Sequence, residues 1–278
     1  ALAMLHTIDR RSLPPEEKAY YALTYYLAQN KSGLDVANDS LIRVAYNYYA
    51  KFPKDSLYAR CMYYMGFYYS LNDSLERANY CLKEAQRTAK VQKDTATLCL
   101  AMTRYSWVVR KTHPEAGLEY AKRVLGLYEK YSKRNVFNIV YNTLMVCECE
   151  NFCGNPRRAF SLAQQAEKNA LALGDSTVIS DVYQDMAYFA VSLGDKRSTH
   201  FALLSCRYSD TRFVSKRLML AKAYEKTGNY HECINLLDTL RLENNGQRYE
   251  AFAMRHRAAV KLNDPAALSY ADSAYHYI

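Results

Sequence analysis

The sequence has little of what interrupts helices. Its 278 residues include only nine glycines and six prolines, and no stretch rich in Pro, Gly or Ser separates one part of the chain from another. Apolar residues recur at helical spacing rather than in strict alternation, so strands are not expected. No run approaches the roughly 20 consecutive apolar residues that a membrane-spanning helix requires. These absences exclude β-rich and membrane-spanning folds and favour an all-α protein.

Motifs of common catalytic sites are also missing. The chain has no glycine-rich phosphate-binding loop, no HExxH or GxSxG motif, and no Cys–His spacing typical of a metal site. Its six histidines are dispersed along the chain, and a single histidine on a helix is more often a core or surface residue than a general base. We therefore expect a non-catalytic protein with no cofactor and no bound metal.

The net charge of +9 is concentrated toward the C-terminal end. Residues 196–261 contain 13 Lys or Arg against 6 Asp or Glu, and such a surplus favours acidic partners. No long basic run and no mixed aromatic and basic motif of nucleic-acid binders accompanies it. We interpret these residues as solvated outer faces of helices. We expect no direct binding of nucleic acid, and contact with a membrane only through segments outside this sequence.

The eight cysteines occupy positions typical of packed helices. Cys147, Cys206 and Cys233 stand where equivalent segments carry Gly or Ala, as small buried hydrophobic residues do. We interpret the cysteines as structural thiols, with a Cys149–Cys153 disulfide and a metal site as alternatives. Eight unpaired thiols would favour a reducing compartment.

Small residues recur at a constant spacing. Gly66, Ala187 and Ala221 each begin the same pattern of small and apolar positions. The pattern continues with Tyr69, Ala78, Leu82 and Ala85 after Gly66, with Ala190, Thr199, Leu203 and Cys206 after Ala187, and with Tyr224, Cys233, Leu237 and Leu240 after Ala221. Small side chains at these positions let paired helices approach closely, and a single hairpin cannot bury its apolar face alone. The spacing also predicts a helix remnant over 1–13 and a helix over 230–241.

Ala187 and Ala221 lie 34 residues apart. With Gly228-Asn229-Tyr230 as a hairpin turn, this period resembles tetratricopeptide repeats over nearly the whole chain. The resemblance implies a right-handed α-solenoid of about seven helical hairpins, forming a single domain over 1–278. The repeats that fit best span 59–92, 140–173, 180–213, 214–247 and 248–278, whereas 1–54 and 93–135 are degenerate. Trp is absent from the fourth position and no Pro closes the repeats.

The N-terminal end carries a narrower resemblance. Glu17-Lys18-Ala19, Asp39-Ser40-Leu41-Ile42, Tyr48-Tyr49 and Tyr63-Tyr64-Met65-Gly66 are similar to tetratricopeptide proteins abundant in Bacteroidetes. Many of these are exported and membrane-anchored, and some continue into a transmembrane helix, a coiled coil and a helix-turn-helix regulator. The resemblance implies the extracytoplasmic sensor part of a longer regulator. It agrees with a sequence that begins Ala-Leu-Ala and ends inside an expected helix, so that both ends look cut.

The second, fifth, ninth and twelfth positions of each first helix line the concave groove in this family. Carried onto this chain, the predicted ligand-binding residues are Arg60, Tyr63, Phe67, Tyr141, Glu148, Asn151, Asp181, Gln184, Tyr188, Lys222, Tyr249 and His256. Any single aromatic residue of this set is more often involved in helix packing than in binding, so the prediction concerns the set. Its mixture of aromatic, amide and charged groups suits a protein or peptide ligand.

Two other functions remain open. A cytoplasmic peptide-responsive adaptor would suit the unpaired thiols. A glycan-associated surface lipoprotein would use the tyrosines of the groove to stack on sugars.

Overall fold

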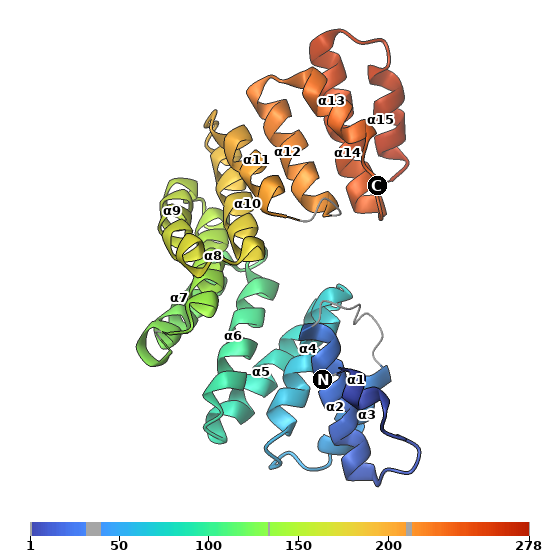
Figure 1. Cartoon of the computed structure of the whole chain (residues 1–278), viewed down its shortest axis with the longest axis vertical. Coiled ribbons are helices and arrows are strands. Elements are labelled where there is room, and N and C mark those ends of the chain that lie inside the picture. Colours follow the sequence, from blue (N-terminus) through green and yellow to red (C-terminus); the bar gives the residue numbers. More distant parts are fainter. Residues whose placement is uncertain (1, 32–39, 133, 210–212, 278) are drawn as a thin grey trace. The chain divides into compact units, whose positions relative to one another are not determined.

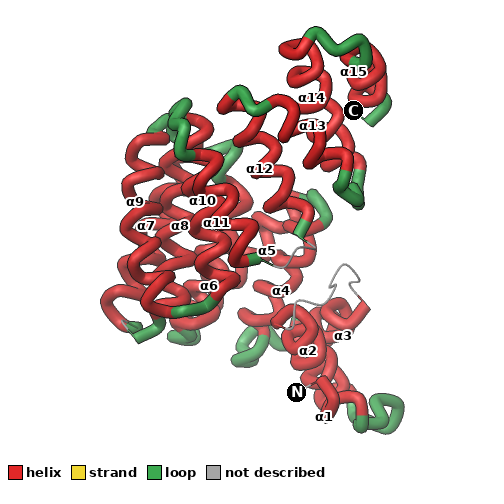
Figure 2. The backbone as a smooth tube through the Cα atoms, turned by 45° about the horizontal axis from the view of Figure 1, so that its top comes forward, coloured by secondary structure: helices red, strands yellow, loops and turns green. Residues whose placement is uncertain are grey.

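The computed structural model describes residues 2–31, 40–132, 134–209 and 213–277. Within these ranges the chain forms fifteen α-helices and no strand (Figure 2), which confirms the all-α prediction. The chain divides into two compact units, residues 1–127 (the N-terminal unit) and 128–278 (the C-terminal unit). The prediction of one continuous domain stays a prediction, and each unit is described by itself.

The N-terminal unit contains three helical hairpins (Figure 1). Its helices are α1 (Leu2–His6), α2 (Pro15–Lys31), α3 (Ser40–Tyr49), α4 (Tyr58–Leu71), α5 (Leu75–Val91), α6 (Thr95–Val109) and α7 (Pro114–Tyr131), and the boundary between the units falls within α7. Helix α2 packs on α3, α4 on α5, and α6 on α7, while α4 also contacts α6. The helix remnant expected over 1–13 extends only over α1.

The C-terminal unit contains four more hairpins, so the prediction of about seven is confirmed. Its helices are α8 (Val136–Phe152), α9 (Pro156–Leu173), α10 (Ser176–Ser192), α11 (Ser198–Tyr208), α12 (Val214–Thr227), α13 (Tyr230–Asp238), α14 (Asn245–Leu262) and α15 (Ala267–Tyr275). The first helices of successive hairpins contact one another, α8 with α10, α10 with α12, and α12 with α14. We call these four helices the first-helix layer.

Side chains near the turns define where the helices begin and end. The Asp94 carboxylate accepts a hydrogen bond from the Thr97 N–H at 3.0 Å, and Asp175 accepts from Thr177 and Val178 at 2.9 and 3.1 Å. These carboxylates satisfy N–H groups that have no partner within the helix. Gly174 ends α9 with a φ of +71°, a left-handed conformation that glycine adopts without strain.

Small residues lie where the sequence pattern requires close helix packing. Gly66, Ala187 and Ala221 are buried. Between α10 and α11, the hydroxyls of Ser180 and Ser205 each donate to the other residue's carbonyl oxygen at 2.8 Å. This reciprocal pair satisfies two buried hydroxyls and brings the two helix backbones close together.

None of the eight cysteines forms a disulfide, so Cys149 and Cys153 are not linked to each other. Six are buried, and Cys153 and Cys206 are half-buried. Burial raises the pKa of the Cys81 thiol to about 11. Among the described residues, no three His, Cys, Asp or Glu side chains are placed to hold a metal ion, and no helix is long and apolar enough to cross a membrane.

Candidate functional site

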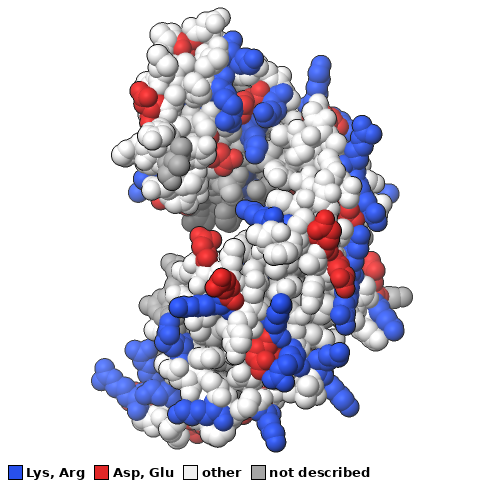
Figure 3. Space-filling model, turned by 180° about the vertical axis from the view of Figure 1, so that it is seen from behind, with Lys and Arg blue, Asp and Glu red and all other residues white. Residues whose placement is uncertain are grey.

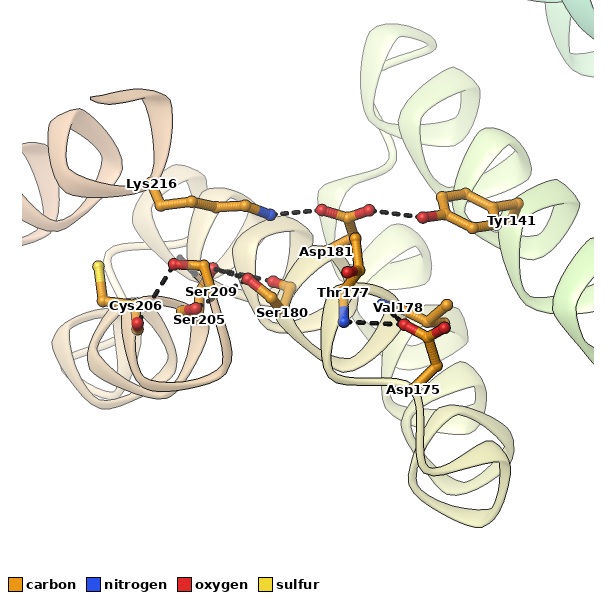
Figure 4. Close-up of polar contacts among 10 residues, drawn as sticks. All are labelled: Tyr141, Asp175, Thr177, Val178, Ser180, Asp181, Ser205, Cys206, Ser209 and Lys216. Atoms are coloured by element: carbon orange, nitrogen blue, oxygen red, sulfur yellow. Dashed lines mark hydrogen bonds and ion pairs between the residues drawn. The ribbon is translucent and has the colours of Figure 1, made fainter. Parts of the chain in front are cut away.

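One carboxylate joins three helices of the first-helix layer. Figure 4 shows Asp181 of α10 between Tyr141 of α8 and Lys216 of α12. The Tyr141 hydroxyl donates to Oδ2 of Asp181 at 2.7 Å, and the Lys216 ammonium donates to Oδ1. We call these three residues the Asp181 triad.

The triad satisfies a lysine that is largely removed from water. Lys216 is only 6% exposed, and a buried ammonium group is stable only when it is paired and hydrogen-bonded. Burial is the main cause of the raised pKa of Tyr141, and the hydrogen bond to Asp181 raises it further. Tyr141 therefore stays protonated at neutral pH and remains a donor.

Further contacts connect α12 with its neighbours in the layer. Lys222 of α12 has its Nζ 5.7 Å from the ring centroid of Tyr188 in α10 and 3.9 Å from Oε1 of Glu250 in α14. Glu225 of α12 is buried and accepts two hydrogen bonds from the Arg257 guanidinium of α14, at 2.7 and 2.9 Å. Such two-point pairing restricts both side chains to one geometry.

The structure brings some of the predicted residues together and separates others. Tyr141 meets Asp181, and Tyr188 meets Lys222, while Glu148, Asn151 and Gln184 are half-buried on the same helices. Tyr249 is 44% exposed on α14. His256 instead faces the second helix of its hairpin, where its Nδ1 lies 2.9 Å from the carbonyl oxygen of Ala267.

In the N-terminal unit, two predicted residues lie in the core. Tyr63 and Phe67 are 8% and 9% exposed and belong to the packed cluster of that unit. The Arg104 guanidinium of α6 lies 4.0 Å from the Phe67 ring centroid. Burial raises the pKa of Tyr63, and the positive charge of Arg104, together with a hydrogen bond, partly offsets that rise. Little of either ring is exposed, and their assignment to the ligand-binding groove stays a prediction. Arg60 is half-buried, with Nε 3.4 Å from the Thr97 hydroxyl.

Several contributing residues were missed by the sequence interpretation, namely Lys216, Glu250, Arg257 and Arg104. Lys216 and Asp181 are 35 residues apart, and Arg257 and Glu225 are 32 apart. Opposite charges separated by about one repeat, on neighbouring first helices, are therefore the signal that could have found these pairs. No equivalent signal exists for Arg104, whose partners are aromatic rings.

No family model matches the chain, and no curated protein matches it. Among solved structures it is similar to a Rap protein complexed with Competence and Sporulation Factor, with a TM-score of 0.69, 14% identity, and coverage of 93% of this chain and 86% of that one. It is also similar to the apo form of RapI, with a TM-score of 0.61, 11% identity, and coverage of 99% of this chain and 96% of that one.

A third similar structure is a signal-transduction ATPase with a tetratricopeptide repeat sensor from Pyrococcus horikoshii. Its TM-score is 0.66 at 13% identity, and the match covers 94% of this chain but only 42% of that protein. At these identities the likeness concerns the fold. The fold of this chain is that of tetratricopeptide-repeat proteins.

Proposed function

We propose that the first-helix layer of the C-terminal unit reversibly binds a peptide or a segment of another protein. The observation that carries the proposal is the Asp181 triad, together with the contact of Lys222 with Tyr188. These contacts hold aromatic, cationic and anionic groups of successive helices in defined positions before a ligand arrives. Preorganised side chains lose less conformational freedom on binding, which favours affinity.

The chemistry of the layer suits an extended peptide. Asp181, Gln184 and Tyr188 are three and four residues apart on α10, so they share one helix face. A carboxylate, an amide and a phenol in a row offer acceptors and donors to a peptide backbone, and the Tyr188 ring offers contact area at a low entropic cost. Lys222 adds a cation beside that ring.

Similar structures support a role in sensing. The Pyrococcus protein is described as carrying a tetratricopeptide repeat sensor, and the Rap protein was solved in complex with a factor. We extend the proposal to a sensor within a longer regulator on the extracytoplasmic side of a membrane. A cytoplasmic adaptor is the second candidate, because none of the eight cysteines forms a disulfide.

Peptides selected against the intact chain by display provide the probe for a binding test. We expect Tyr188→Ala to lower the affinity for a selected peptide by about thirtyfold, the effect of removing a side chain that contributes about 2 kcal/mol to binding. Isothermal titration calorimetry measures the affinity. Tyr275→Ala removes a tyrosine that is 79% exposed on α15 and lies outside the layer. This variant should bind the selected peptide with the affinity of the wild type. Equal affinity of the Tyr188 variant and the wild type would disprove the proposed site.

A further inference from the structure

Most arginines of the C-terminal unit that form contacts are paired with carboxylates. The pairs are Arg158 with Glu150, Arg197 with Asp195, Arg255 with Asp238, and Arg257 with Glu225. On the face of the molecule drawn in Figure 3, Lys and Arg side chains lie among Asp and Glu side chains. Arg217, Arg241 and Arg248 differ, because within the described ranges none of them has a carboxylate partner.

These three arginines line one cleft. It has a volume of about 670 Å³ and lies between the start of α12, the non-helical segment after α13 and the start of α14. Arg217 donates to the Thr239 hydroxyl at 2.8 Å, and the Arg248 guanidinium lies 3.4 Å from the side-chain oxygen of Asn245. The Arg248 guanidinium also lies 5.6 Å from the centroid of the Tyr277 ring. All these partners are neutral, so none of them carries a charge that compensates either arginine.

Part of the lining of the cleft is apolar. Val214, Leu240 and Leu242 line it and are half-buried, because they also pack against the core cluster formed by α12, α13 and α14. Glu243 is the only acidic side chain among the residues that line the cleft. The cleft therefore combines three positive charges, one negative charge and an aliphatic surface.

We propose that this cleft binds an acidic peptide segment of a partner protein, separately from the ligand of the first-helix layer. Guanidinium groups pair with carboxylates through two parallel hydrogen bonds, and Arg217, Arg241 and Arg248 supply this chemistry. The aliphatic surface of Leu240 and Leu242 receives an apolar side chain of the same segment. A nucleic-acid strand fits less well, because no aromatic side chain lines the cleft to stack on a base.

The test uses a fluorescein-labelled octapeptide of alternating leucine and glutamate, and fluorescence anisotropy with the intact chain at low ionic strength. We expect Arg241→Glu to weaken binding by about tenfold or more, since a favourable ionic contact becomes a repulsive one. Lys168→Glu makes the same change of charge at an exposed position of α9 and should leave the affinity unchanged. Tyr188→Ala should also bind the probe normally, which separates this site from the first-helix layer.

Arg248→Gln provides a second variant, and melting curves of all variants show whether they fold. Binding that is equally weakened by Arg241→Glu and Lys168→Glu would overturn the proposal, because the effect would then come from net charge alone. Equal affinity for the octapeptide with glutamine in place of glutamate would overturn it as well. If a single-stranded oligonucleotide binds more tightly than the octapeptide and loses affinity in Arg241→Glu, the cleft is a nucleic-acid site instead.

Discussion

Replacing Gly66 by alanine is expected to lower the free energy of unfolding of the N-terminal unit by about 1–3 kcal/mol, the usual cost of overpacking a close contact. A Cβ at this position would lie 2.7 Å from Cγ and 2.9 Å from Cδ2 of Leu82, and 3.3 Å from the carbonyl oxygen of Ala78. Leu82 is fully buried in α5, so it has little room to move. The clash outweighs the roughly 1 kcal/mol that alanine gains over glycine in a helix.

Gly126 offers a matched control for this prediction. It also lies within a helix, α7, but a Cβ there would have no atom within 4 Å. Gly126→Ala is therefore expected to stabilise the chain by about 0.5–1 kcal/mol through helix propensity. Urea unfolding followed by circular dichroism measures both variants. If Gly66→Ala were as stable as Gly126→Ala, the α4–α5 contact would be looser than the structure indicates.

Replacing Asp181 by alanine is expected to destabilise the C-terminal unit by about 2–4 kcal/mol, because it leaves the buried Lys216 without its counter-charge. The expected loss is below the largest values for buried pairs, since the Asp181 side chain is 32% exposed and water reaches the site. Lys216→Met removes the charge but keeps most of the side-chain volume. It should cost less than Asp181→Ala, because a partly exposed carboxylate can be hydrated when it loses its partner.

The double variant Asp181→Ala/Lys216→Met completes a double-mutant cycle for this pair. We expect it to recover much of the stability lost in Asp181→Ala, because no buried charge is left unpaired. Urea denaturation at neutral pH gives the four free energies. Additive losses in the double variant would show that the two charges do not interact.

The hairpin arrangement could be predicted because it depends on local sequence. Small residues at the repeat positions and the helical spacing of apolar residues predict about seven helical hairpins, and the described residues form seven. The helix expected over 230–241 ends earlier, at Asp238. The Thr239 hydroxyl donates to the Leu236 carbonyl at 2.7 Å, and such local hydrogen bonds compete with continuation of a helix.

The candidate site was only partly predictable, because cross-helix contacts depend on how neighbouring helices cross. Repeat positions identified Tyr141, Asp181 and Tyr188, which lie on the first-helix layer. Lys216 follows the position on α12 that is equivalent to Asp181 on α10. That its side chain points toward Asp181 depends on how the two helices pack, which the repeat pattern does not specify. The burial of Tyr63 could not be predicted from the repeat positions for the same reason, since it depends on packing within the core cluster of the N-terminal unit.

The most direct test of the central claim is to locate a bound peptide by photo-crosslinking. A benzoylphenylalanine placed at Gln184 on α10, within the first-helix layer, is compared with one at Leu171, which is 46% exposed on α9 and outside the layer. Each variant is irradiated with a display-selected peptide, and the product is identified by mass spectrometry. We predict a crosslink from position 184 and none from position 171. A crosslink from 171 alone would contradict the claim that the first-helix layer is the binding surface.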